Sequence, residues 1–359
     1  MERIIFHVDV NNAFLSWEAA YRIRYLGASV DLRQIPSAVA GDASARHGII
    51  LAKSQPAKKY GVCTGETIGQ AKGKCPQLYM VPPNYNLYQQ CSHAFQSILK
   101  EYTPDVEPYS IDECYMDMTE TMHLFGKPVE TADEIRRRIE RELGFTVNIG
   151  VASNKLLAKM ASELRKPNYT HSLFPWEIQE KMWPLSISRL FFVGKATRRK
   201  LETLGIRTIG ELAAVDPEVL RPVLHKHGEQ IWNFANGRDD AQVKAEAHTN
   251  KGYGNSTTIA FDVKDQETAR KVLLALSGGV DSSVCIQILR DQGFDVQAVV
   301  IRFSPAHDAA VRAAQTVARQ LGVPLIEEDC TEEFEQQVVE PFCAQYCAGR
   351  TPSPCVLCN

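Results

Sequence analysis

Three acidic residues stand in or beside short apolar runs, where an unpaired carboxylate is costly to bury. Asp9 lies near the end of the β-rich run 3–10, and Asp112 and Glu113 lie in the similar run 109–118. Carboxylates gathered beside a sheet are typical of sites for two Mg²⁺ ions, which clamp the attacking and leaving oxygens in phosphoryl transfer. Adjacent residues of a regular strand face opposite ways, so Asp112 and Glu113 need a bend or bulge to converge. From spacing alone, solvated hairpin acids remain the alternative.

A second candidate site is the Gly-rich loop in KVLLALSGGVDSS, residues 271–283. An apolar run suited to a buried strand precedes the loop, and a helix is expected to begin at Val280. The backbone N–H groups of such a loop, together with the helix N-terminus, bind pyrophosphate. The loop is not of the Walker type, because no Gly-Lys-Ser/Thr sequence follows it. A plain Gly-rich β-turn is the alternative.

The elements expected around the acids mix strands and helices. Strands are predicted over 3–10 and 145–151, a strand pair over 109–118, and helices over 13–25, 85–102, 133–143 and 154–165. This order favours a multidomain α+β region with an antiparallel sheet. A strict alternation follows the Gly-rich loop: helix 280–290, strand 296–301, helix 306–321, strand 324–328 and a helix from 332. That alternation predicts a partial α/β domain with a parallel sheet.

The composition sets limits on the kind of protein. A chain of 359 residues with 44% hydrophobic residues is expected to form two to four globular domains. Its net charge of −3 does not by itself indicate nucleic-acid binding. A local basic face would nevertheless be sufficient to bind nucleic acid. The N-terminus does not resemble a signal peptide, and no apolar run is long enough for a membrane helix. Ten irregularly spaced cysteines indicate free thiols in a reducing cytoplasm, where a monomer without membrane partners is expected.

The acids belong to a set of motifs that occurs in a known order. HVDVNNAF, AKKYGV, SIDECYMD, NIGVASNKLLAKMAS and RKPN follow one another as in Y-family (translesion) DNA polymerases. The sequence resembles the DNA polymerase IV branch most closely, over residues 1–276. The resemblance implies a palm (1–15 and 76–170), fingers (16–75), a thumb (171–240), a tether (241–251) and a little-finger fragment (252–272).

The resemblance also assigns roles to single residues. Asp9 and Asp112 would bridge both Mg²⁺ ions, and Glu113 would hold the ion that activates the primer 3′-hydroxyl. Phe14 matches the steric gate that excludes the 2′-hydroxyl of a ribonucleotide, and Lys166 matches the lysine that contacts the incoming triphosphate. An ordinary core phenylalanine and a solvated lysine at a helix end are the alternatives for these two.

Some positions depart from the family pattern or carry no clear role. Asn11 stands where the family usually has a second Asp, which is not a metal ligand. Gln55 and Lys58 align with the Tyr and Arg that grip the triphosphate, so nucleotide binding is expected to rest on Lys58 and to be weaker. Lys155 and Lys159 are interpreted as lysines on the surface of a helix.

Residues 190–212, LFFVGKATRRKLETLGIRTIGEL, resemble a helix-hairpin-helix. Gly194 and Gly205 occupy the turn positions, where small residues let backbone N–H groups approach a DNA phosphate without reading its sequence. A plain helical hairpin is the alternative. Basic residues follow nearby: Arg198, Arg199, Lys200 and Arg207.

The Gly-rich loop carries a second resemblance. Its SGGxDS pattern is that of the PP-loop ATP pyrophosphatases. The resemblance implies that ATP and its Mg²⁺ are bound by Ser277, Gly278, Gly279, Asp281 and Ser282. The ending AGRTPSPCVLCN is similar to tRNA 2-thiouridylases, in which Cys358 would be the nucleophilic cysteine and tRNA the partner. We expect no more than ATP binding from this region. A zinc or iron–sulfur site is the alternative for its four cysteines: Cys343, Cys347, Cys355 and Cys358.

The two resemblances overlap at residues 271–276. Ala269, Val272, Leu273 and Leu276 have the spacing of a helix face, whereas 272–276 is also the unbroken apolar run of a central parallel strand. We predict the strand, because without it the α/β unit loses its central strand. A chimeric sequence is favoured over a selected fusion of two genes.

The sequence therefore predicts a template-directed DNA polymerase of low processivity that uses primer-template DNA, deoxynucleotides and two Mg²⁺ ions. ATP-dependent tRNA uridine 2-thiolation by the C-terminal region is one alternative. A DNA-binding protein without catalysis is the other.

Overall fold

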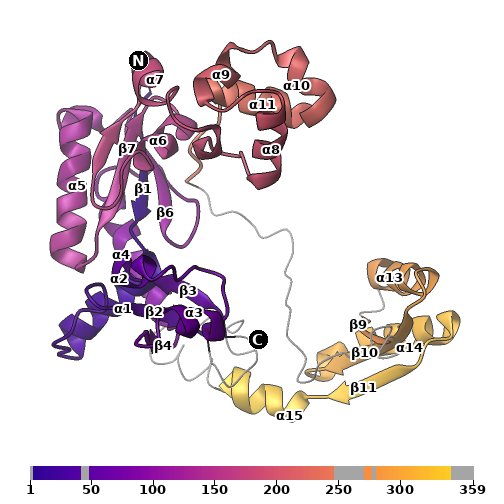
Figure 1. The fold of residues 1–359 in the computed structure, drawn as a ribbon. Helices are drawn as coiled ribbons and strands as arrows, with labels where there is room; N and C mark the ends of the chain where they lie inside the picture. The colour runs from indigo at the N-terminus through magenta and orange to yellow at the C-terminus, as the bar shows by residue number, and fades with distance from the viewer. Residues whose placement is uncertain (1–2, 42–47, 246–270, 277–279, 341–359) are drawn as a thin grey trace. The chain divides into compact units, whose positions relative to one another are not determined.

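The computed structural model describes residues 3–41, 48–245, 271–276 and 280–340 (Figure 1). The chain divides into two compact units, residues 1–251 and 252–359. Each is described by itself.

A five-stranded sheet forms the centre of the first unit, in the order β5-β6-β1-β7-β8. Its strands are β1 (Ile5–Val10), β5 (Val106–Pro108), β6 (Glu113–Asp117), β7 (Val147–Ala152) and β8 (Thr170–Ser172). The central strand β1 pairs antiparallel with both β6 and β7, and β7 pairs parallel with β8. Every residue of β1 and β7 is buried, including the polar His7, Asp9 and Asn148. The predicted α+β architecture is confirmed.

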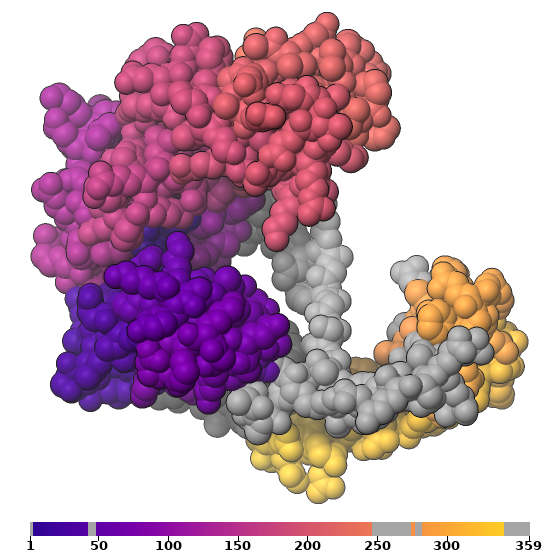
Figure 2. Space-filling model, in the orientation of Figure 1, coloured from indigo at the N-terminus to yellow at the C-terminus, as the bar shows by residue number. Residues whose placement is uncertain are grey.

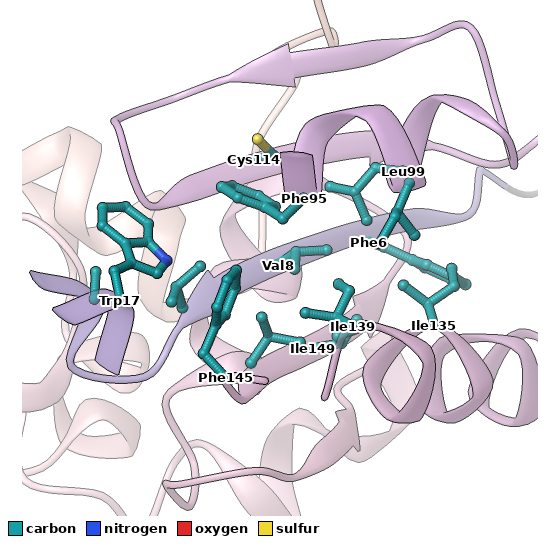
Figure 3. Packing of buried hydrophobic residues seen from close by; sticks show 14 of the residues in the cluster. Phe6, Val8, Trp17, Phe95, Leu99, Cys114, Ile135, Ile139, Phe145 and Ile149 are labelled. Atoms are coloured by element: carbon teal, nitrogen blue, oxygen red, sulfur yellow. The ribbon is translucent and has the colours of Figure 1, made fainter. Parts of the chain in front are cut away.

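Helices cover both faces of this sheet. They are α4 (Tyr85–Lys100), α5 (Pro128–Leu143) and α6 (Lys155–Ser162). Because side chains alternate along a strand, Phe6 and Val8 enter the core beneath α4 and α5 (Figure 3), whereas His7 and Asp9 lie on the opposite face. Helix α6 packs tightly on that face. A Cβ at Gly150 would lie 1.9 Å from the Ala158 carbonyl oxygen, so β7 requires glycine there.

A three-stranded sheet of order β3-β2-β4 forms the region assigned to the fingers. Its strands are β2 (Ser37–Ala40), β3 (Ile50–Lys53) and β4 (Tyr79–Val81), and its helices are α2 (Gln55–Lys59) and α3 (Ile68–Lys74). Helix α1 (Ala13–Tyr25) links this region to β1 and has the predicted bounds.

The region assigned to the thumb is helical. It contains α7 (Ile178–Lys181), α8 (Lys195–Thr203), α9 (Ile209–Ala214), α10 (Pro217–Leu224) and α11 (Lys226–Ala235). It also contains the 3₁₀ turns η2 (Pro175–Glu177) and η3 (Ile187–Arg189), whereas η1 (Met122–Leu124) lies in the region assigned to the palm. Gly205, with φ of +82°, makes the tight turn between α8 and α9. The chain then returns to the palm, since the Leu156 N–H donates to Asp239 and the Lys244 N–H to Glu107. The surfaces of thumb and palm are continuous in the space-filling view (Figure 2).

Two boundaries differ from the sequence prediction around the acids. The predicted strand pair 109–118 is wrong in position, because β5 ends at Pro108 and β6 begins at Glu113. The residues between them form a turn, in which the Tyr109 N–H donates to the Glu113 carbonyl oxygen. Helix α6 ends at Ser162, whereas the sequence predicted an end at residue 165. The proline at position 167 disfavours helical backbone in the residue before it.

The second unit is a parallel sheet of order β11-β10-β9. Its elements are β9 (Lys271–Ala275), α13 (Val280–Asp291), β10 (Asp295–Arg302), η4 (Pro305–His307), α14 (Asp308–Leu321), β11 (Leu325–Asp329), α15 (Thr331–Phe334) and the π-helical η5 (Glu335–Val339). The predicted alternation is confirmed. Residues 271–275 form the predicted strand, with Val272 opposite Val296. The expectation of a central strand was wrong for the described sheet, because β10 is central and β9 lies at the edge.

Candidate active site

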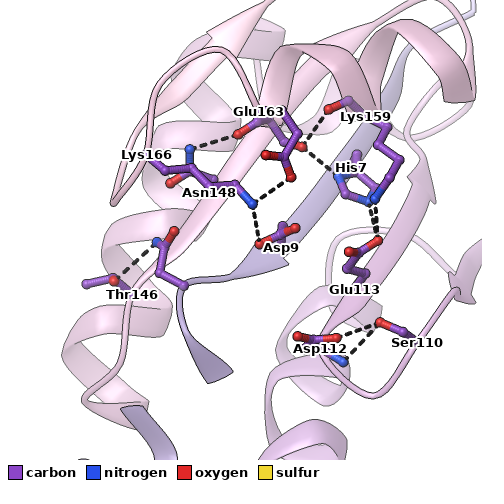
Figure 4. Close-up of polar contacts among 12 residues, drawn as sticks. His7, Asp9, Ser110, Asp112, Glu113, Thr146, Asn148, Lys159, Glu163 and Lys166 are labelled. Atoms are coloured by element: carbon purple, nitrogen blue, oxygen red, sulfur yellow. Dashed lines mark hydrogen bonds and ion pairs between the residues drawn. The ribbon is translucent and has the colours of Figure 1, made fainter. Parts of the chain in front are cut away.

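The three acids lie at one end of the central sheet. Asp9 on β1 is the direct register partner of Glu113 on β6. Asp112 ends the preceding turn, and its carbonyl oxygen accepts a hydrogen bond of 3.0 Å from the Val10 N–H. The turn therefore supplies the bend that the sequence required, and it leaves Asp112 half-buried at the sheet edge (Figure 4).

The carboxylates nevertheless do not share one coordination sphere. Within the described residues, no group of three His, Cys, Asp or Glu side chains is arranged to hold a metal ion. In Figure 4 each of the three carboxylates has a different partner. Asp9 accepts from Lys166 at 2.9 Å, Glu113 from Lys159 at 2.5 Å, and Asp112 from the Ser110 hydroxyl at 2.6 Å.

Asp9 is strongly desolvated. Burial raises the pKa of this carboxyl to about 6, against the opposing effect of Lys166. Lys166 also binds Glu163 at 2.6 Å and keeps about a third of its side chain exposed, 32%. Burial lowers the pKa of Lys166, but Asp9 and Glu163 outweigh it and the net direction is upward. Asp9 is thus a buried carboxylate whose charge is offset by the ammonium group of Lys166.

The raised pKa of Asp9 predicts a pH-dependent effect of Asp9→Asn. The folded state binds this proton more tightly than the unfolded chain, so ionised Asp9 costs stability progressively as the pH rises from 3.8 to about 6. We expect the substitution to increase the free energy of unfolding, by about 1–1.5 kcal/mol more at pH 8 than at pH 5. Urea unfolding in EDTA at both pH values measures this. An equal gain at both would contradict the burial of an ionisable Asp9.

Glu113 is held by a second network. Lys159 lies 2.5 Å from Oε2, and Nε2 of the fully buried His7 lies 3.3 Å from the same oxygen. Burial raises the pKa of Glu113, but the hydrogen bonds from His7 and Lys159 outweigh it and hold the pKa at about 2. Burial lowers the pKa of His7 to about 4, so the ring is neutral near pH 7. It then donates from Nε2 to Glu113, and its Nδ1 lies 2.8 Å from the Ser162 hydroxyl oxygen.

The interpretation of Lys155 and Lys159 as surface lysines was wrong. Their side chains are only 13% and 12% exposed, and Lys155 pairs with Glu107 at 2.7 Å. The close packing of α6 on β7 turns both lysines toward β5 and β6. Sequence reasoning also missed His7, although its position two residues before Asp9 places both side chains on one face of a strand.

Lys159→Met is expected to destabilise the fold by about 2–4 kcal/mol at pH 7, because it leaves the charge of Glu113 partly buried without its cation. Chemical unfolding measures this loss. Lys58→Met is the matched control, since Lys58 is exposed on α2, and should change stability by less than about 0.5 kcal/mol. A small effect at Lys159 would show that the ion pair does not persist in solution.

The predicted nucleotide contacts lie on the neighbouring elements. Phe14 is in the first turn of α1, half-buried, and its ring stacks on Tyr88 with centroids 4.7 Å apart. Lys58 is exposed on α2 and is not brought to the acids by any contact in the described residues. Asn11 donates to the Thr146 hydroxyl oxygen at 3.2 Å, and its own Oδ1 is buried without a hydrogen-bond partner.

The helix-hairpin-helix glycines take the predicted turn positions. Gly194 is the N-cap residue of α8, and Gly205 follows the end of that helix with positive φ. The first turns of α8 expose basic side chains: Lys195, Arg198 and Arg199.

The second candidate site falls largely outside the described residues. Ser277, Gly278, Gly279 and Cys358 belong to the ranges that the structure does not describe, as do Cys343, Cys347 and Cys355. The expected strand–loop–helix order around the loop is present, with Asp281 and Ser282 in the first turn of α13. Among the described residues, no helix is long and apolar enough to cross a membrane.

Comparison with known proteins decides the family. Residues 8–163 match the impB/mucB/samB family, and residues 175–206 match the IMS family HHH motif. DNA polymerase IV of Clostridium acetobutylicum is 46% identical over 276 residues, which cover 77% of this chain and 69% of the relative. The chain belongs to the DNA polymerase IV family. DNA polymerase IV of Acetivibrio thermocellus is 38% identical over 95% of this chain and 82% of its own length.

Solved structures and the C-terminal region complete the comparison. The crystal structure of DinB from Sulfolobus solfataricus matches with a TM-score of 0.60 and 26% identity, over 67% of this chain and 69% of that one. Residues 270–359 match the tRNA methyl transferase HUP domain. The Y-family resemblance and the fusion of two domain types are therefore confirmed.

Proposed function

We propose that this chain is a template-directed DNA polymerase of the translesion type. The observation that carries the proposal is the pairing of Asp9 with Glu113 at the sheet end, beside the turn that holds Asp112, within a member of the DNA polymerase IV family. In the reaction, the primer 3′-oxygen forms a bond to the α-phosphorus of a deoxynucleotide. The bond to pyrophosphate breaks, and the hydroxyl proton is released.

The acids provide the donors that two Mg²⁺ ions require. Carboxylate oxygens are the preferred protein ligands of Mg²⁺, and the buried Asp9 and the partly buried Glu113 each pair with a lysine in this structure. Asp9 and Asp112 would hold both ions and Glu113 the ion beside the primer. Ions held by these residues would lower the pKa of the 3′-hydroxyl and offset charge on the phosphates.

Lys166 and Phe14 then act on the nucleotide. Lys166, which pairs with Asp9 in this structure and keeps about a third of its side chain exposed, would bind the triphosphate through its ammonium group. Phe14 presents its ring at the start of α1, stacked on Tyr88, and excludes a ribose 2′-hydroxyl. Lys58 contributes charge from α2 without a bidentate contact.

The thumb contacts the duplex through α8 and α9. Backbone N–H groups at Gly194 and Gly205 approach phosphates, and the exposed Lys195 and Arg199 add charge. Such contacts read no sequence, as a polymerase moving along DNA requires.

Primer extension tests the proposal. The purified chain, Mg²⁺ and four deoxynucleotides are incubated with a recessed primer-template, and a DNA trap is added to prevent rebinding. We expect products only a few nucleotides longer than the primer, because processivity is low. No product from folded protein in excess over DNA would refute the proposal.

The match to a HUP domain favours a second candidate function. We propose that residues 271–340, with the Gly-rich loop, bind ATP, because a loop between a parallel strand and a helix presents N–H groups to phosphate. Sulfur transfer to tRNA through Cys358 extends this candidate. Isothermal titration with ATP and Mg²⁺ tests the binding, with Gly278→Asp as the variant expected to abolish it. ATP-dependent release of AMP stimulated by tRNA would extend it to catalysis.

A further inference from the structure

An exposed phenylalanine occupies a strained position in the helix-hairpin-helix. The Val193 N–H donates to the Leu190 carbonyl oxygen at 3.1 Å, which closes a four-residue turn. Phe192 is the third residue of this turn and has φ of +69°. A turn of this kind normally places glycine there, since a Cβ is unfavourable at positive φ.

The ring of Phe192 is not needed to fill the core. It is 51% exposed, whereas Leu190 and Val193 on either side are buried at 2% and 9% exposure. These two side chains anchor the turn, so the backbone places Phe192 outward. A strained backbone conformation at the surface motivates the hypothesis that the ring has a functional contact.

Neighbouring rings hold Phe192 in place. Its centroid lies 4.5 Å from that of Phe191 in an edge-to-face arrangement and 5.8 Å from that of Phe234. Phe191 in turn lies beneath the ammonium group of Lys159, 5.5 Å from the ring centroid, and Lys159 binds the proposed metal ligand Glu113. Lys159 thus contacts both the turn that contains Phe192 and the acid Glu113.

The surroundings fit DNA. The turn leads directly into Gly194 and the N-terminus of α8, where Lys195 and Arg199 are exposed. Positive charge and free backbone N–H groups suit phosphates, and an aromatic ring between them suits the apolar face of a deoxyribose. We propose that Phe192 packs against the sugars of the primer-template duplex as the turn binds the adjoining phosphates. This inference rests on the proposed polymerase function.

Phe192→Gly separates this role from a structural one. Glycine tolerates the positive φ, so relief of strain offsets the lost ring contacts, and the midpoint of thermal unfolding should move by less than about 2 °C. Fluorescence anisotropy with a labelled primer-template should show binding weakened about 5- to 50-fold, as for loss of an aromatic contact to nucleic acid. Phe192→Asn, which also accepts positive φ, should behave alike.

Salt dependence provides the control. The slope of log Kd against log salt should be unchanged in Phe192→Gly, because no charge is lost, and should fall by about 1 in Lys195→Gln. Unchanged duplex affinity in Phe192→Gly would overturn the inference while leaving the polymerase function intact. A large fall in the unfolding midpoint, or an equal loss of affinity for a single-stranded oligonucleotide, would also overturn it. Failure of the unmodified chain to bind duplex would instead refute the polymerase function.

Discussion

Asp112→Asn should abolish primer extension, with a loss of at least about 10³-fold. The substitution removes one charge from a ligand proposed to bridge both metals, and several kcal/mol of transition-state stabilisation depend on that charge. The fold should be unaffected, because the only side-chain partner of Asp112 among the described residues is the Ser110 hydroxyl. Single-turnover extension at saturating Mg²⁺ measures the loss.

Two control variants make this result specific. Glu120→Gln removes an exposed acid close by in sequence and should leave extension unchanged. Ser110→Ala removes the hydrogen bond to Asp112 and should change the rate by only a few-fold. Duplex binding by the Asp112 variant should be retained. Extension that survives the substitution would show that Asp112 is not a metal ligand.

Phe14→Ala should increase the use of ribonucleotides relative to deoxynucleotides by about 100-fold. The expected change corresponds to about 3 kcal/mol, the upper range of the cost of forcing extra atoms into a packed site. Incorporation of a single ribonucleotide and its deoxy counterpart, compared as kcat/KM, measures the change. The ring of Phe14 stacks on Tyr88 at 4.7 Å, so its removal is also expected to cost some stability.

Tyr25→Ala is the matched control for Phe14. It removes an aromatic ring from the same helix, but Tyr25 is 75% exposed at the far end of α1. Its selectivity for the sugar should equal that of the unmodified chain. Equal selectivity in Phe14→Ala would assign Phe14 to the core, which is the ordinary role of a phenylalanine on a helix.

Local sequence patterns were sufficient to predict many of the helices and strands. Helix α1 was predicted with its observed bounds, Ala13–Tyr25. The unbroken apolar run at 272–276 predicts a parallel strand, and β9 is one, although it lies at the edge of the described sheet rather than in its centre. The requirement for a bend at Asp112 followed from strand geometry and is met by a turn.

The electrostatics of the site could not be predicted in the same way. Lys155 and Lys159 have the spacing of an exposed helix face, and their partners Glu107 and Glu113 lie 48 and 46 residues away in the chain. Only the packing of α6 against β7 brings these charges together. For the same reason, no sequence pattern showed that Asp9 would pair with Lys166 and Glu113 with Lys159.

Single-nucleotide insertion on four templates that differ only in the templating base tests the central claim most directly. With Mg²⁺ and one deoxynucleotide at a time, we predict that the chain inserts the complementary nucleotide on each template at least ten times faster than any other, as expected for about 1.4 kcal/mol of discrimination. Insertion that ignores the template, or no insertion by folded protein that binds the duplex, would contradict the assignment of this chain as a template-directed DNA polymerase.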